Sequence, residues 1–122
     1  MNKKEVERLA EKYFDKLVHL LGESKYQKHT PYLVIENNPQ SEGIDNDWHG
    51  EFVPDENEII IYSDNITSKS DLAKTMVHEY THYLQDPKWM TRYYNMGYTY
   101  KTHPYEIQAF LMEDLNWHKI CR

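Results

Sequence analysis

The chain contains 122 residues, a length that fits one domain with a single hydrophobic core and is short for two. Hydrophobic residues make up 39% of the sequence, and eleven tyrosines and three tryptophans add large side chains that a core can bury. A folded α+β domain over residues 1–122 is therefore expected. The formal net charge of −6 opposes binding to a nucleic-acid backbone.

Several features bear on where the protein resides. Cys121 is the only cysteine, so no internal disulfide bond is possible, which agrees with a reducing compartment. The N-terminal residues lead into a charged helix rather than into the apolar segment of a secretory signal. The apolar run Ile59–Tyr62 is far shorter than the roughly 20 residues that a membrane-spanning helix needs. We expect a cytoplasmic protein that does not bind membranes.

The first half of the chain predicts one helix and three strands. Apolar residues spaced three and four apart predict an amphipathic helix over residues 2–22, ended by Gly22. Strands are predicted at 32–36, 48–53 and 58–62, and a turn at 54–57 joins the last two as a hairpin. Residues 37–47 are predicted to form a loop. Its acidic residues, like those at 55–58, lack the twelve-residue pattern of a calcium loop, so solvated charge is favoured.

The second half predicts two helices separated by a loop. Ser68 and Asp71 form a capping signal, and helical spacing continues from there until Asp86 and Pro87. Residues 88–102 are rich in aromatic side chains and are interrupted at Gly97, which predicts a long loop. The last helix is predicted to begin near residue 104 and to continue to about residue 120. The order is helix, three strands, helix, loop and helix.

The segment His78-Glu79-Tyr80-Thr81-His82 carries the residue types of a metal site. Residues four apart on a helix share one face, with Cβ atoms about 6 Å apart, so His78 and His82 can bind one ion. Glu79 is offset by about 100° around the helix axis, where its carboxylate can reach a water molecule on the metal. Zinc would lower the pKa of that water toward about 7, and Glu79 would accept its proton as general base. Random order would produce this pattern in roughly 4% of chains of this composition, so its helical context matters.

A zinc site that keeps one position open needs a third protein ligand. Glu106, in the first turn of the predicted last helix, is preferred, and the alternative is a capping contact with the amide of His103. Asp86 lies one turn beyond the second histidine and is a poor ligand. Three roles stay open for His103. In order of preference they are helix cap, oxyanion donor and metal ligand. Gln85 and Lys88 occupy the positions where metzincins carry glycine and histidine, which excludes that class.

These residues resemble those of the gluzincin metallopeptidases, and the element order resembles that of the minigluzincins. The resemblance covers the chain in order, but its specific residues are few. It implies that His78, His82 and Glu106 bind Zn²⁺, that Glu79 is the catalytic base, and that the protein is a hydrolase acting on peptide bonds. The subfamily stays open, because certain phage-associated peptidases also use such a helix.

The chain departs from the larger gluzincins at two places. Phe110 stands four residues after the glutamate, where relatives carry an acid that orients a ligand histidine, so Glu113 and Asp114 are the candidates for that role. The histidine and tyrosine that stabilise the oxyanion in larger relatives are also missing. Each tyrosine of the loop at 88–102 is expected to serve in packing. One of them could replace the missing oxyanion-stabilising groups, and the candidates are Tyr93, Tyr94, Tyr98 and Tyr100.

Two functional hypotheses follow. The first is a zinc-dependent peptidase that binds a peptide or protein substrate as an added strand along residues 48–53. The second is a latent or non-catalytic zinc-binding module with a covered or closed site, in which His103 is the fourth ligand. A plain α+β interaction protein without metal is the residual alternative. The oligomeric state is not specified by the sequence.

Overall fold

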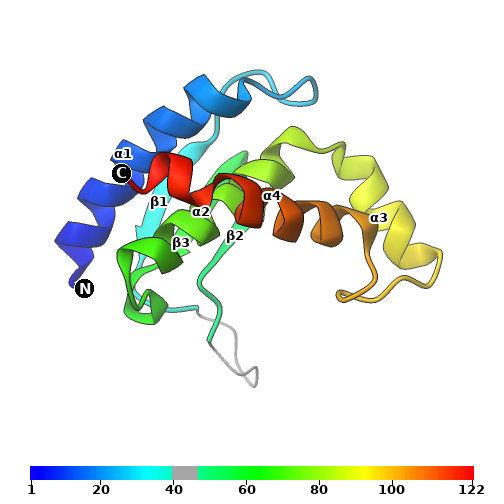
Figure 1. The fold of residues 1–122 in the computed structure, drawn as a ribbon. Helices are drawn as coiled ribbons and strands as arrows, with labels where there is room; N and C mark the ends of the chain where they lie inside the picture. Colours follow the sequence, from blue (N-terminus) through cyan, green and yellow to red (C-terminus); the bar gives the residue numbers. More distant parts are fainter. Residues whose placement is uncertain (40–46) are drawn as a thin grey trace.

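The computed structural model describes residues 1–39 and 47–122 and has the α+β architecture expected from the sequence (Figure 1). Most of the predicted loop at 37–47, including Asp45, lies outside the described residues. The described elements are α1 (Lys3–Leu21), β1 (Tyr32–Glu36), β2 (Gly50–Val53), β3 (Glu58–Tyr62), the 3₁₀ turn η1 (Ser63–Asn65), α2 (Lys69–Leu84), α3 (Pro87–Asn95) and α4 (Pro104–Ile120).

The first helix agrees with its predicted bounds to within one residue at each end. The side chain of Asn2 caps α1 by accepting a hydrogen bond from the amide of Glu5 at 2.9 Å. The helix ends at Gly22, whose φ of 77° lies in the region that glycine adopts without steric cost. The face of α1 that packs into the core consists of Val6, Leu9, Ala10, Tyr13 and Leu17.

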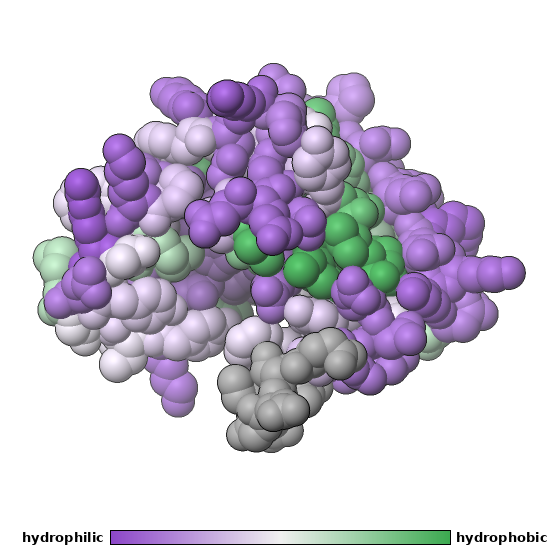
Figure 2. All heavy atoms as spheres, turned by 180° about the vertical axis from the view of Figure 1, so that it is seen from behind, coloured by the Kyte–Doolittle hydropathy of each residue, from purple (hydrophilic) through white to green (hydrophobic). Residues whose placement is uncertain are grey.

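The three strands form one mixed sheet with the order β1-β3-β2. The predicted hairpin is confirmed, because β2 pairs antiparallel with β3, whereas β1 pairs parallel with β3. The strand β2 is consequently an edge strand, and its free side carries unpaired backbone groups. Helices α1 and α2 lie on one face of the sheet, and Figure 2 shows the opposite side as a largely hydrophilic surface with a small hydrophobic area.

The core lies between this sheet, α1 and α2. Ile59 and Ile61 point from β3 toward α2, where Met76, Val77 and Tyr80 are fully buried. Burial on this scale is the main stabilising contribution to such a fold, at about 25 cal/mol per Å² of apolar surface. The core therefore fixes α2 against the sheet and leaves the outer side of α2 for α4.

The expected loop over residues 88–102 is wrong in its first half, because residues Pro87–Asn95 form α3. Asp86 caps this helix by accepting a hydrogen bond from the amide of Lys88 at 3.0 Å, and Pro87 occupies its first turn. The Asp-Pro pair was interpreted only as the end of the preceding helix, but the same pair also starts a helix. None of the described helices has the length and apolar composition required to cross a membrane.

Candidate metal centre

Helix α2 presents two histidines on the face that points away from the core. Ser68 caps α2 by accepting a hydrogen bond from the amide of Asp71 at 3.1 Å, as the capping signal predicts. His78 and His82 follow on successive turns, and their ring centroids lie 4.9 Å apart. Both side chains are buried, so the two rings lie close together with little access to bulk water.

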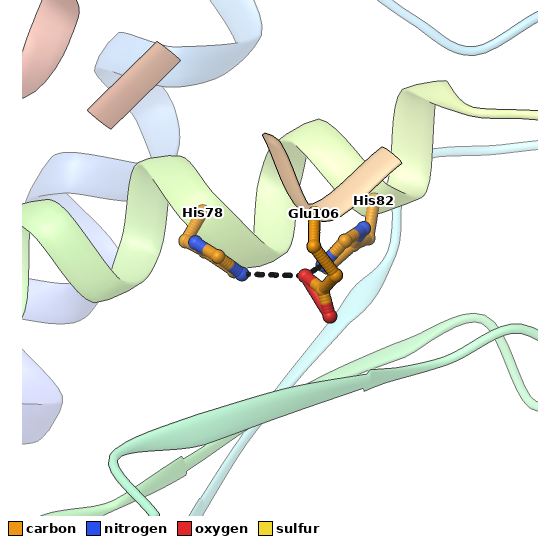
Figure 3. A group of neighbouring side chains, drawn as sticks. All are labelled: His78, His82 and Glu106. Carbon is orange, nitrogen blue, oxygen red and sulfur yellow. Dashed lines mark hydrogen bonds and ion pairs between the residues drawn. The ribbon is translucent and has the colours of Figure 1, made fainter. Parts of the chain in front are cut away.

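Glu106 comes from the first turn of α4 and meets both histidines (Figure 3). Its Oε1 lies 3.0 Å from Nε2 of His78 and 2.6 Å from Nε2 of His82. One ligand atom from each residue lies within 4.8 Å of the others, and all three residues are buried. The three residues named from the sequence therefore form a group that could hold a metal ion. The alternative in which Glu106 caps its own helix is wrong, because its side chain contacts the two histidines and the amide of His103 donates to the backbone oxygen of Thr99.

The far nitrogen of each histidine ring is also occupied. Nδ1 of His78 lies 2.5 Å from Oε2 of Glu113, and Nδ1 of His82 lies 2.7 Å from Oε1 of Gln85. The amide nitrogen of Gln85 in turn donates to the backbone oxygen of Tyr105 at 3.0 Å. These contacts orient both rings so that Nε2 points to the shared centre, as partners of metal-binding histidines do.

Of the two acids considered for this orienting role, the structure selects Glu113. It lies seven residues after Glu106, which places both carboxylates on one face of α4 two turns apart. The neighbouring Asp114 is exposed. The role of Gln85 is not predicted from the sequence, although Gln85 follows His82 by only three residues. Its side chain is also held by Tyr105 and Gln108 of α4.

Without a metal, this group is a network of positive rings and negative carboxylates. Burial lowers the pKa of His78, but hydrogen bonds with Glu106 and Glu113 outweigh it and raise that pKa to about 10. The pKa of His82 is also raised, again against the effect of burial, by the hydrogen bond with Glu106. Burial raises the pKa of Glu106, and the two histidines more than reverse this, lowering it to about 2.

Glu79 lies beside this group and faces the same cleft. Glu79 is buried, and among the described residues it makes no hydrogen bond or ion pair. It differs in this from His78, His82 and Glu106. Burial raises its pKa, and the charges of His82 and His78 partly offset this effect. Its carboxylate is therefore free to interact with a molecule bound in the cleft.

His103 acts as the cap of α4, the first of the three roles considered for it. Its Nδ1 accepts a hydrogen bond from the amide of Tyr105 at 3.0 Å, and its Nε2 donates to the backbone oxygen of Met90 at 2.9 Å. The side chain is completely buried. Because both ring nitrogens are engaged, the idea that His103 closes the site as a fourth ligand is wrong for this conformation.

The group formed by His78, His82 and Glu106 lies in a cleft of about 770 Å³ between β2 and helices α2, α3 and α4. One wall is the edge strand β2, together with Trp48 and His49 before it. Of the four loop tyrosines named from the sequence, Tyr94 and Tyr100 line the cleft. Tyr93 and Tyr98 do not, and their rings pack against each other with centroids 5.5 Å apart.

Comparisons with known proteins do not add a family to this description. The chain matches no protein-family model, no curated protein and no solved structure. What the fold and the site define is an α+β protein with a buried group of two histidines and one glutamate that could bind a metal ion. Any finer assignment depends on the chemistry of that group.

Proposed function

We propose that the protein is a zinc-dependent peptidase of the gluzincin type. The observation that carries this proposal is the meeting of Glu106 with His78 and His82 at an open cleft, with the unpaired carboxylate of Glu79 beside them. The same four residues carry the pattern of a zinc site in the sequence. Their agreement with the geometry supports the proposal.

The donor set favours zinc. Two imidazole nitrogens and one carboxylate oxygen are ligands that Zn²⁺ accepts in catalytic sites, which keep one further position open. The hydrogen bonds of Glu113 and Gln85 to the far ring nitrogens fit the support that such ligands have. When bound here, zinc would polarise a carbonyl group and lower the pKa of water.

Glu79 is the proposed general base. Its raised pKa increases its affinity for the proton that it takes from the attacking water, and the same proton can then pass to the leaving amine. The absence of a hydrogen-bond partner among the described residues leaves both oxygens of Glu79 available for this transfer. Tyr100 and Tyr94 line the same cleft, so their hydroxyl groups are the proposed donors to the carbonyl oxygen of the substrate.

The proposed substrate is an extended polypeptide segment. The strand β2 is at the edge of the sheet and forms a wall of the cleft, so a peptide can pair with its free backbone groups. This arrangement would place the peptide opposite His78 and His82 of α2 and Glu106 of α4. A latent or non-catalytic zinc module is less well supported, because His103 is engaged elsewhere and the cleft is open along β2.

Metal analysis and a peptide digest together test the proposal. The wild-type protein is expected to hold one zinc per chain and to cleave members of a broad peptide library. His82→Ala should lose the zinc, whereas His19→Ala, which changes an exposed histidine on α1, should keep it. Glu79→Gln should keep the zinc and lose at least about 100-fold in turnover, the lower end of what a general base contributes.

The outcomes separate the metal site from the activity. Zinc retained in His82→Ala would remove the metal site as described. Zinc bound by the wild type with no cleavage of any peptide would favour the non-catalytic module. Unchanged turnover in Glu79→Gln would remove Glu79 from the mechanism.

A further inference from the structure

Helix α4 has an inverted distribution of polar and apolar side chains. Its buried positions include Glu106 and Asn116, whereas three large apolar residues lie on its outer side. Ile107, Leu111 and Leu115 are 54%, 55% and 54% exposed. They follow one another at intervals of four residues and so form one stripe along the helix. An exposed apolar stripe of this kind is a candidate contact surface.

The stripe continues beyond α4. Phe110 is 46% exposed beside it, and the ring of Tyr100, 54% exposed, packs on Phe110 with centroids 6.2 Å apart. Both side chains also line the cleft, and the Phe110 ring packs on that of His78 with centroids 4.7 Å apart. Figure 1 shows α4 on the outer side of α2, and no other element of residues 1–39 and 47–122 crosses it there. We define the α4 stripe as these five side chains: Tyr100, Ile107, Phe110, Leu111 and Leu115.

We propose that the α4 stripe is the interface of a twofold-symmetric homodimer. Five half-exposed side chains of this size offer at most roughly 500 Å² of apolar surface per chain, because part of the surface of Tyr100 and Phe110 faces the cleft. A stable interface buries about 800 Å² per partner, of which about 56–65% is apolar, or roughly 450–520 Å². At the upper limit of this estimate, the α4 stripe matches the apolar part of a homodimer interface, and polar neighbours on α4 supply the rest.

The sequence of α4 also suits antiparallel pairing with itself. A twofold axis at Leu111 places Leu111 opposite its own copy and Ile107 opposite Leu115 of the other copy. The same axis places Asp114 opposite Gln108, so these positions bring no like charges together. Antiparallel pairing also opposes the dipoles of the two helices favourably.

The open face of the sheet does not suit self-association. Val34 and Ile60 pair there but are only partly exposed, and Figure 2 shows this side of the molecule as a largely hydrophilic surface. Three glutamates share this face by strand alternation, namely Glu36, Glu51 and Glu58. A second copy packed there would bring like charges together, which costs several kcal/mol in an interface.

Sedimentation velocity tests the dimer. At roughly 100 µM chain, where an interface with a micromolar Kd is mostly assembled, the wild-type protein is expected to sediment with twice the mass of the chain. Leu111→Glu places two carboxylates at the twofold axis and is expected to raise the Kd at least about 100-fold, so that about half or more of the chains are monomeric at this concentration and the average mass falls below that of the dimer. Leu20→Glu is the matched control, because Leu20 is a 42% exposed leucine on α1, outside the α4 stripe.

Every result of this experiment has a consequence. A monomeric wild type at this concentration would overturn the proposal, and so would a Leu111→Glu variant that still dimerises like the control. Circular dichroism shows whether each variant is folded, and Leu111→Ser removes the apolar contact without adding charge if Leu111→Glu does not fold. Because mass is the readout, the result is independent of peptidase activity.

Discussion

The contact between Glu113 and His78 makes a quantitative prediction about metal affinity. Glu113→Gln keeps the size of the side chain and removes its charge, so the hydrogen bond with Nδ1 of His78 loses its ionic component. The bond is short, 2.5 Å, and both partners are mostly shielded, with side-chain exposures of 9% for His78 and 17% for Glu113. Solvent therefore screens it only weakly, and the effect should be large.

Loss of such an orienting partner lowers the affinity for metal by about 10–100-fold. This corresponds to about 1.4–2.8 kcal/mol of binding free energy. The loss of metal affinity in Glu113→Gln is expected in the upper half of this range, because His78 has no other partner at Nδ1 among the described residues. Glu113→Gln should also lower the pKa of His78 in the metal-free protein, since Glu113 is one of the causes of its raised value.

Competition with a chromophoric chelator measures the zinc affinity, and NMR titration of the His78 ring measures its pKa. Asp114→Asn is the matched control, because it removes an equal charge from the adjacent, exposed position of the same helix. An equal loss of affinity in both variants would mean that long-range charge, not the contact with His78, sets the effect. No loss in Glu113→Gln would refute the reasoning outright.

Three further predictions follow from the same geometry. In the metal-free protein, the stabilisation from His78 is complete below pH 6.5 and is lost as pH rises through about 10, whereas that from Glu106 is complete above pH 4.5 and is lost as pH falls through about 2. Urea unfolding should thus give the largest stability from this pair between pH 4.5 and 6.5, and a curve that keeps rising to pH 9 would contradict it. Gly50→Ala should destabilise the protein by about 1–3 kcal/mol, because its Cβ would lie 2.8 Å from the oxygen of Ile60; unchanged urea unfolding would show that β2 shifts freely. Tyr100→Phe should lower kcat of the proposed peptidase with a smaller change in KM, and a raised KM with unchanged kcat would assign Tyr100 to substrate binding instead.

The parts of the site that follow from local patterns could be predicted. His78 and His82 share a face because of helical periodicity alone, and Pro104 fixes the start of the helix that carries Glu106. The coordination requirement then selected Glu106 from the later residues, although no spacing rule connects positions 82 and 106. The contact of the three residues in the structure agrees with that selection.

The parts that depend on packing between helices were missed. Gln85 follows His82 by three residues, but its side chain is held in place by Gln108 of α4 at 2.7 Å, a contact that forms only when α2 and α4 pack together. Helix α3 was missed for a different reason. It buries none of its side chains completely, and its aromatic residues gave no clear indication of a face turned to a core.

Helix α4 shows that the spacing of apolar residues can predict a helix correctly without predicting which of its faces packs against the core. Ile107, Leu111 and Leu115 mark the helix correctly, but the structure places them outside, because the inner face is occupied by Glu106 and Glu113. The carboxylates of Glu106 and Glu113 both contact histidines of α2, and helical geometry then turns the apolar stripe to the opposite side. The proposed metal centre and the proposed dimer interface are thus two consequences of one helix.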